Sequence, residues 1–145
     1  MLFGLSPLSA VPDCRALESI LLSVLSALEA EMVFIRNLVG GLLAELEDDI
    51  DRDKFKSLLH YSRRLASFQS RAKLVQEAIE EVLEQDEDMT AMYLTDKKND
   101  IPRLMDDHEE LEVLLESFAK QVEEIVNEAE NIHVRKRQAN ESGWY

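Results

Sequence analysis

Apolar side chains recur along most of this chain at alternating steps of three and four residues, the spacing of a helix face in a coiled coil. An extra four-residue step between Leu28 and Met32 is a stutter, which changes the winding of such a helix locally. The pattern predicts a long amphipathic helix over 14–49. Its apolar positions are Leu17, Leu21, Val24, Leu28, Met32, Ile35, Val39, Leu42 and Leu46.

Two further stretches carry the same kind of pattern. The apolar positions are Leu58, Leu65, Phe68, Ala72, Val75, Ile79 and Val82 in one, and Leu111, Leu115, Phe118, Val122, Ile125, Ala129 and Ile132 in the other. Asp51 suits an N-cap before the second helix, and Pro102 suits the start of the third. These features predict helices over 52–90 and 104–133. Because no alternating strand pattern is found, we predict an all-α fold of three long antiparallel helices in an elongated, coiled-coil-like bundle.

The two ends of the chain differ from the predicted bundle, which we place at 13–133. Residues 1–12 lack charge and are expected to form a flexible N-terminal segment. After His133 the sequence VRKRQANESGWY is first basic and then polar, so a disordered tail is expected over 134–145. Inside the first helix, Gly40 and Gly41 each cost about 1 kcal/mol relative to alanine. They are expected to mark a kink or a close contact with another helix.

Charge narrows the classes of ligand. Thirty acidic residues against sixteen basic ones give a net charge of -14. Nucleic acids and anionic lipids need a basic face, so neither is expected as the main ligand, and cations are the natural counter-charge. The only cysteine, Cys14, leaves no intrachain disulfide or thiolate metal cluster and is expected to be a small buried residue.

Signals for membrane insertion, targeting and catalysis are weak. Charged residues interrupt every apolar run before it reaches the roughly 20 residues of a transmembrane helix, so the chain as given is expected to be soluble. Its start has no basic region typical of a targeting signal. His60, His108 and His133 are too far apart for a local zinc motif, and His108 is expected on a helix surface. We predict that the protein is not an enzyme and has no catalytic residues.

Carboxylates gather in three clusters along the chain. The predicted topology brings the second and third clusters to the same end of the bundle. One interpretation is a solvated acidic face; the other is a magnesium site, since Mg2+ takes oxygen ligands and is often held by one or two carboxylates. The clusters are Glu47, Asp48, Asp49, Asp51 and Asp53; Glu84, Asp86, Glu87 and Asp88; and Asp106, Asp107, Glu109, Glu110 and Glu112.

Three strings of residues resemble a known family. They are Arg15-Ala16-Leu17-Glu18, then EQDEDMTAMYLTDKK from Glu84 to Lys98, then Asp106-Asp107-His108-Glu109-Glu110. In the same order, similar strings occur in the CorA-like magnesium transporters, in the eukaryotic branch of the mitochondrial inner membrane. The likeness runs from about Pro12 to Ile132. The membrane span and the Gly-Met-Asn signature that the family places after the third helix are absent from this sequence.

The resemblance implies a function and a set of site residues. It implies the helical part of a magnesium transporter on the matrix side of the mitochondrial inner membrane, with low-affinity regulatory Mg2+ between the subunits of a homopentamer. The Mg2+ would cancel repulsion between acidic faces and so hold the subunits closed. The implied metal-binding residues are Glu84, Asp86, Glu87, Asp88, Asp107, Glu109 and Glu110.

Two questions each have two possible answers: the role of an apolar stripe beside these carboxylates, and the function of the chain itself. Met89, Met92, Tyr93 and Leu94 would either pack at a helix end or, by the resemblance, form a subunit interface. The chain would be either a transporter portion truncated before the pore or a coiled-coil interaction module that handles no ions.

Overall fold

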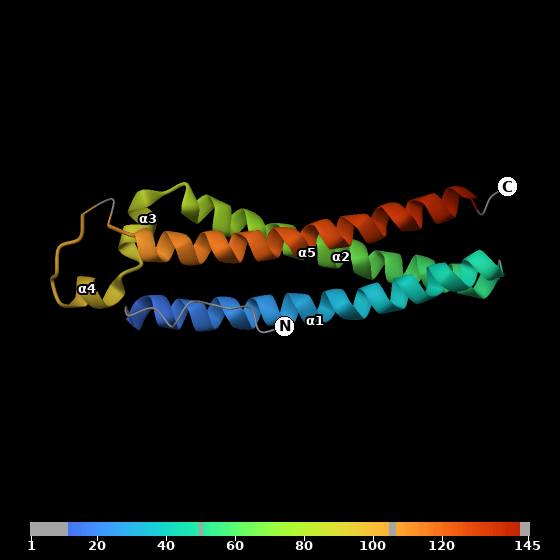
Figure 1. The fold of residues 1–145 in the computed structure, drawn as a ribbon, viewed down its shortest axis with the longest axis horizontal. Coiled ribbons are helices and arrows are strands. Elements are labelled where there is room, and N and C mark those ends of the chain that lie inside the picture. Colours follow the sequence, from blue (N-terminus) through green and yellow to red (C-terminus); the bar gives the residue numbers. More distant parts are fainter. Residues whose placement is uncertain (1–11, 50, 105–106, 143–145) are drawn as a thin grey trace.

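The computed structural model describes residues 12–49, 51–104 and 107–142, and over this part the chain is almost entirely helical. Its helices are α1 (Pro12–Asp48), α2 (Arg52–Leu83), α3 (Asp86–Ala91), α4 (Leu94–Lys98) and α5 (Glu109–Ser142). Figure 1 shows three long helices lying side by side as a rod, with α1 and α5 parallel and α2 antiparallel to both. The predicted all-α bundle of three long helices is confirmed.

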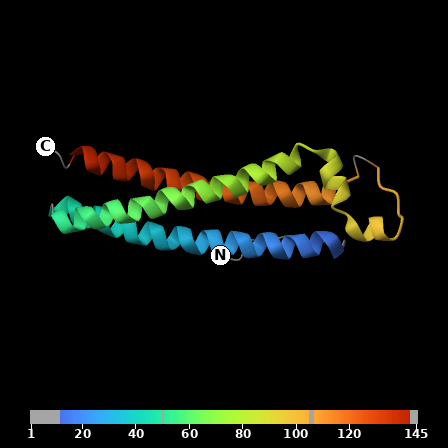
Figure 2. The same ribbon diagram turned by 180° about the vertical axis from the view of Figure 1, so that it is seen from behind.

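The two ends of the rod are built differently. At one end a short connection joins α1 to α2, and α5 also ends at this end of the rod, as the reverse view in Figure 2 shows. At the other end the short helices α3 and α4 and the loop that follows them connect α2 to α5, beside the first turns of α1. We call this the α3–α4 end; it comprises α3, α4, the loop residues 99–104 and 107–108, and the first turns of α1 and α5.

The core of the rod consists largely of the apolar positions that the heptad pattern marked, but α1 buries Leu25 and Leu43 where Val24 and Leu42 were expected, and Val24 is 36% exposed. The buried positions of α1 therefore place the extra four-residue step between Val39 and Leu43, which corrects the expected stutter between Leu28 and Met32. Met32 and Val39 on α1, Phe68 on α2 and Val122 on α5 are at most 1% exposed. Each fully buried side chain of this size contributes roughly 1.5–3 kcal/mol to folding. None of the helices in the described part of the chain is long and apolar enough to cross a membrane.

Polar contacts on the surface of the rod include a helix cap and an ion pair between two helices. Asp51 caps α2, because its Oδ1 accepts a hydrogen bond from the backbone N–H of Asp53 at 2.9 Å. Arg71 donates to Glu31 across α1 and α2 at 2.7 Å. Since the Arg71 side chain is half exposed, a pair of this kind contributes about 0–1 kcal/mol.

The predicted helix boundaries near the α3–α4 end are wrong. The second helix was expected to run to 90, but α2 ends at Leu83 and a turn at Glu84 separates it from α3. The third helix was expected from 104, but α5 begins at Glu109. The run of acidic residues after Glu84 favours a new helix start, because α3 places Asp86, Glu87 and Asp88 in its first turn, at the positive end of the helix dipole.

The expected disordered tail over 134–145 is also corrected, because α5 continues to Ser142. Arginine, lysine, glutamine and alanine are good helix formers, and Ala139 packs against the core seven residues after Ile132. Residues 143–145, and residues 1–11 of the expected flexible N-terminal segment, lie outside the described part; Pro12 already belongs to α1. Close contacts at Gly40 and Gly41 are not formed, since a Cβ added at either would meet nothing within 4 Å.

Candidate functional site

The α3–α4 end is tied to α1 by a carboxylate from the first turn of that helix. Asp13 accepts two hydrogen bonds from Thr95, one from the backbone N–H and one from the hydroxyl, both at 2.9 Å. Thr95 is the second residue of α4, and the N-cap residue of that helix provides no side-chain cap. Asp13 therefore acts as an N-terminal cap supplied from 82 positions away in the sequence.

Tyr93 lies at the centre of this end, in the connection between α3 and α4. Its side chain is 3% exposed and packs near the buried Cys14 of α1. Burial raises the pKa of the Tyr93 hydroxyl to about 12, and the neighbouring Cys14 thiol adds to this shift. The phenol therefore stays neutral over the physiological range, joining α1 to the α3–α4 connection.

Arg103 holds the loop between α4 and α5 in place. Its Nε donates to Oδ2 of Asp96 at 2.7 Å, and its Nη1 donates to the backbone carbonyl of Asp107 at 2.7 Å. The guanidinium carbon lies 3.5 Å from the centre of the Tyr93 ring, a cation–π contact. The neighbouring carboxylates of Asp96 and Asp107 raise the pKa of Arg103 against the opposing effect of burial, which is the largest single influence.

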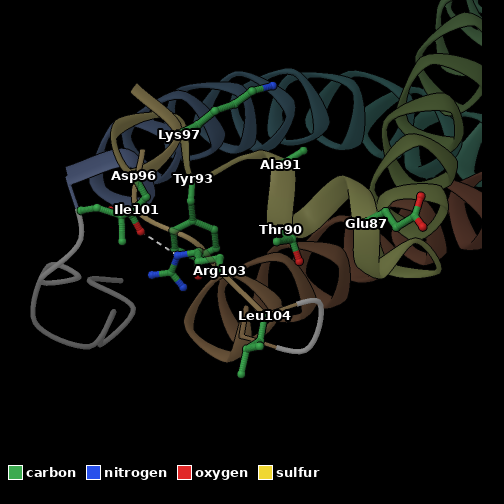
Figure 3. A pocket seen from close by; sticks show the side chains of 9 residues that line it. All are labelled: Glu87, Thr90, Ala91, Tyr93, Asp96, Lys97, Ile101, Arg103 and Leu104. Atoms are coloured by element: carbon green, nitrogen blue, oxygen red, sulfur yellow. Dashed lines mark hydrogen bonds and ion pairs between the residues drawn. The ribbon is translucent and has the colours of Figure 1, made fainter. Parts of the chain in front are cut away.

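Figure 3 shows this arginine in an open pocket of about 550 Å³. The ring of Tyr93 and the guanidinium of Arg103 lie together there, with Asp96 paired to the arginine. Glu87 from α3 and the apolar Ile101 and Leu104 from the loop complete much of the wall. The pocket is a mixture of apolar and charged groups in which the basic group is already paired.

His108 is buried at the start of α5, which corrects its expected place on a helix surface. Its side chain is 5% exposed, with Nε2 3.1 Å from Oδ1 of Asp86 and Nδ1 3.6 Å from Oε2 of Glu112. Neither approach has hydrogen-bond geometry, so these contacts become ion pairs only when the imidazole is protonated. His108 precedes Leu111 by three residues and so extends the apolar stripe of α5, which is the physical reason for its burial.

The carboxylates predicted to bind metal lie on the surface of the α3–α4 end. Glu84 is the C-cap residue that follows α2, Asp86 and its two acidic neighbours form the first turn of α3, and Asp107 lies beside Arg103 just before α5. His108 connects the α3 group to α5 through Asp86. Among the residues that the structure describes, no three acidic, histidine or cysteine side chains come together closely enough to hold a metal ion. All seven are exposed: Glu84, Asp86, Glu87, Asp88, Asp107, Glu109 and Glu110.

The four residues of the predicted apolar interface have different environments. Met89 and Tyr93 are 1% and 3% exposed and belong to the core of this chain. Met92 is partly buried against that core, whereas Leu94 is 64% exposed. Packing at helix ends therefore describes Met89 and Tyr93, and Leu94 is the member of the group with the most surface to offer a second molecule.

Comparison with known proteins shows which family the chain belongs to. A family model described as magnesium transporter MRS2-like matches residues 9–142, which include all five helices and the whole α3–α4 end. The chain belongs to the MRS2-like magnesium transporter family. The family resemblance predicted from three short strings is thereby confirmed over nearly the full chain.

Curated relatives of this MRS2-like chain carry matching names. The mitochondrial inner membrane magnesium transporter LPE10 of Yarrowia lipolytica is 46% identical over 120 residues, which are 83% of this chain and 26% of that protein. The transporter mrs2 of Schizosaccharomyces pombe is 45% identical over 121 residues, 83% of this chain and 29% of the relative. MRS2 of Candida albicans is 50% identical over 117 residues, which are 81% of this chain and 25% of that protein. The chain spans about a quarter of the length of these relatives.

Sequence reasoning missed the residues that hold the α3–α4 end of this MRS2-like chain together. The candidate site residues did not include four that make these contacts: Asp13, Thr95, Arg103 and His108. The contacts of the first three depend on the path of the chain between α3 and α5, which the sequence pattern does not show. A signal did exist for His108, since its spacing to Leu111 and Leu115 continues the heptad. The isolated basic Arg103 between Asp96 and Asp107 was a weaker signal for local ion pairing.

Proposed function

We propose that this chain is the helical part of a transporter that moves Mg2+ across the mitochondrial inner membrane, and that it lies on the matrix side, where its acidic α3–α4 end senses Mg2+. The names of the relatives support the transport and the membrane, since each is a mitochondrial inner membrane magnesium transporter. The sensing role rests on the arrangement of charge at one end of the bundle.

The observation that carries the sensing role is the approach of the α3 carboxylates to the start of α5. Asp86 on α3 lies 3.1 Å from the buried His108 ring, and Glu112 of α5 lies on the other side of that ring. Glu87 and Asp88 extend the negative charge along the first turn of α3, as Glu109 and Glu110 do on α5. Two acidic surfaces of separate elements therefore lie at the same end, and a divalent cation between them would reduce their repulsion.

The proposed ion is held with most of its water. Because the described residues form no group of three ligands, Mg2+ would bind through one or two carboxylates and retain its remaining waters, as this ion often does. Such a site has low affinity, which suits a regulatory ion. Further carboxylates would come from a neighbouring copy in a homopentamer, with Met92 and the exposed Leu94 near the contact.

Gating follows from electrostatics in this proposal. Bound Mg2+ offsets the repulsion between acidic faces and stabilises the closed arrangement of subunits. When Mg2+ is depleted, like charges face each other again and the arrangement loosens. The effect is screened by salt over roughly 8–10 Å at physiological ionic strength, so the ion has to be bound rather than merely nearby.

Isothermal titration of Mg2+ into the purified chain tests this proposal. The wild type is expected to show saturable binding above a Na+ control at equal ionic strength. A variant with Glu84→Gln, Asp86→Asn, Glu87→Gln and Asp88→Asn should lose that binding, because it removes the charge of the α3 end.

The matched control removes four carboxylates from the exposed middle of the rod. These are Glu29→Gln, Glu123→Gln, Glu124→Gln and Glu130→Gln, which change the net charge by the same amount. This control should bind Mg2+ like the wild type. Equal loss of binding in both variants would mean that the ion responds only to the overall charge, and the acidic end would then be a solvated surface.

A second function, a coiled-coil interaction module without ion handling, is favoured by one separate observation. α1 exposes large apolar side chains that helical spacing places on one flank of its buried stripe: Ile20 at 61%, Val24 at 36% and Phe34 at 45%. Such a face suits a partner helix. Sedimentation distinguishes the two: self-association that does not change with Mg2+ supports the module, and association that rises with Mg2+ supports the sensor.

A further inference from the structure

The guanidinium of Arg103 lies among oxygen atoms of the kind that bind a hard metal ion. Its Nε is 2.7 Å from Oδ2 of Asp96, and its Nη1 is 2.7 Å from the backbone carbonyl oxygen of Asp107. The carboxylate of Asp107 adds a third oxygen, 3.4 Å from Nη1. Carboxylate and carbonyl oxygens are the protein ligands that divalent cations such as Mg2+ and Ca2+ take. The guanidinium therefore stands where these oxygens would otherwise attract such an ion.

Contacts on another side of the guanidinium fix it in this place. Figure 3 shows it lying against the ring of Tyr93, with 3.5 Å between the guanidinium carbon and the ring centre. The Arg103 side chain is 19% exposed, and Tyr93 belongs to the buried core of the chain. Arginine stays protonated at physiological pH, so the charge is permanent. The position is thus held by a cation that belongs to the chain itself.

Mg2+ competes poorly with this tethered cation. To bind both Asp96 and Asp107 the ion would have to give up bound water, which Mg2+ does reluctantly. It would also leave the largely buried guanidinium without a partner, and an unpaired buried charge is strongly unfavourable. The covalent link adds to the advantage of Arg103, because it gives the guanidinium a high effective concentration.

The carboxylates of α3 have no such partner. Among the residues that the structure describes, no lysine or arginine forms an ion pair with Asp86, Glu87 or Asp88. The imidazole of His108 lies beside Asp86 but is charged only when it is protonated. The α3–α4 end thus contains two kinds of acidic group: carboxylates neutralised by an arginine of the same chain, and carboxylates open to a cation from solution.

We propose that Arg103 is a resident cation that excludes Mg2+ from Asp96 and Asp107 and so confines the ion to the carboxylates of α3 and of the first turn of α5. The exclusion follows from the contacts of Arg103 alone, whereas the confinement rests on the Mg2+ sensing of the proposed function. Asp107, which the family resemblance implies as a metal ligand, is then a partner of Arg103 instead.

A gain of Mg2+ binding tests the exclusion. The background is the variant with four neutralised α3 carboxylates, in which the binding of the proposed function is removed. Arg103→Met in this background removes the charge and keeps an unbranched apolar stem to lie over the Tyr93 ring. Isothermal titration at equal ionic strength should then show saturable binding of about one Mg2+ per chain above the background, held by the two freed carboxylates.

Two further variants in the same background show whether the charge of Arg103 is responsible. Arg103→Lys keeps a positive charge beside both carboxylates and should show no gain. Arg103→Met combined with Asp96→Asn and Asp107→Asn should lose the gain, because the ligands are removed. Both variants with methionine lack the contacts of the guanidinium, so any loss of order in the loop is common to them and cannot produce a difference in binding.

Three results would overturn the proposal: no gain in Arg103→Met, an equal gain in Arg103→Lys, or a gain that survives the loss of both aspartates. None of them decides the sensing role, which is tested by the wild type against the α3 variant. Conversely, if the α3 variant bound Mg2+ like the wild type, the sensing role would fail, and the added binding in Arg103→Met would still support the exclusion.

Discussion

In the middle of the bundle, Leu65, Phe68 and Val122 are fully buried among apolar side chains, whereas at the α3–α4 end Asp13, Arg103 and His108 connect the elements. The middle depends on repeated burial and tolerates changes on its surface. The end adds single hydrogen bonds and ion pairs to its buried Met89 and Tyr93, and the bonds from Thr95 to Asp13 join residues 82 positions apart. A stable rod thus carries an end where charged side chains help to hold the elements together, which is a suitable place for a response to ions.

The largest expected effect is in the middle of the rod. Phe68→Ala should lower the free energy of unfolding by about 3–5 kcal/mol, because it leaves a cavity where the ring is fully buried. Leu74→Ala on the same helix is the control, since Leu74 is 61% exposed and should cost less than about 0.5 kcal/mol. Urea denaturation followed by circular dichroism measures both. Similar losses for the two would show that the core is not where the structure places it.

At the α3–α4 end, the next largest effect depends on pH. The pKa of Tyr93 is about 12 in the folded chain against 10.0 for an ordinary tyrosine, so between these values the unfolded chain releases a proton that the folded chain keeps. The contribution of the protonated Tyr93 to the free energy of unfolding is therefore complete below pH 10 and is lost as pH rises to about 12. The loss amounts to up to about 3 kcal/mol, at roughly 1.4 kcal/mol per pH unit.

Tyr93→Phe isolates this contribution, because phenylalanine keeps the ring and removes the proton. The difference in unfolding free energy between wild type and variant should be constant up to pH 10 and should then move in favour of the variant. A difference that stays constant from pH 9 to 12 would contradict the buried, neutral tyrosine.

The remote cap of α4 should have a smaller effect. Asp13→Ala removes both hydrogen bonds to Thr95 and should cost about 1–2 kcal/mol. Asp13→Asn keeps one acceptor oxygen and should lose less. Hydrogen exchange can localise the change: amides of α4 should exchange faster in Asp13→Ala, while those in the middle of α2 stay as protected as in the wild type. Uniform acceleration would mean that Asp13 supports the whole rod.

The smallest effect is a gain in stability in the rod. Gly41 is an exposed helical residue, and a Cβ added there meets nothing within 4 Å. Gly41→Ala should therefore raise the free energy of unfolding by about 0.5–1 kcal/mol through the lower entropy of the unfolded chain. The thermal midpoint measures the gain. A decrease would indicate that Gly41 makes a close contact with a second molecule, because the single chain has open space there.

Prediction from sequence succeeds where the structure repeats and fails where it does not. The heptad positions from Leu17 to Ile132 predict three long helices and most of their buried faces, since each helix has one apolar stripe to bury. On α1 the neighbouring leucines Leu25 and Leu43 are buried in place of Val24 and Leu42, because adjacent apolar residues leave the register of the stripe undecided. No repeat encodes the turn at Glu84 or the separate helix α3. The continuation of α5 to Ser142 was missed because a basic, polar composition was given more weight than helix propensity.

The site divides in the same way. The α3 and α5 carboxylates were expected at one end of the bundle, and the topology of α2 and α5 brings them there. Their role in binding Mg2+ stays a prediction. The contact of Asp13 follows from the position of α4 against α1, and that of Arg103 from the path of the chain after α4; the order of the residues alone determines neither.

Hydrogen exchange with and without Mg2+, at equal ionic strength, tests most directly whether the acidic α3–α4 end responds to the ion. Mg2+ should slow exchange at 84–98 and 107–112 and leave the middle of α1 and α2 unchanged. The variant with four neutralised α3 carboxylates should lose this response, and the mid-rod control should keep it. Exchange that is unaffected by Mg2+, or slowed equally along the whole rod, would contradict the sensing role.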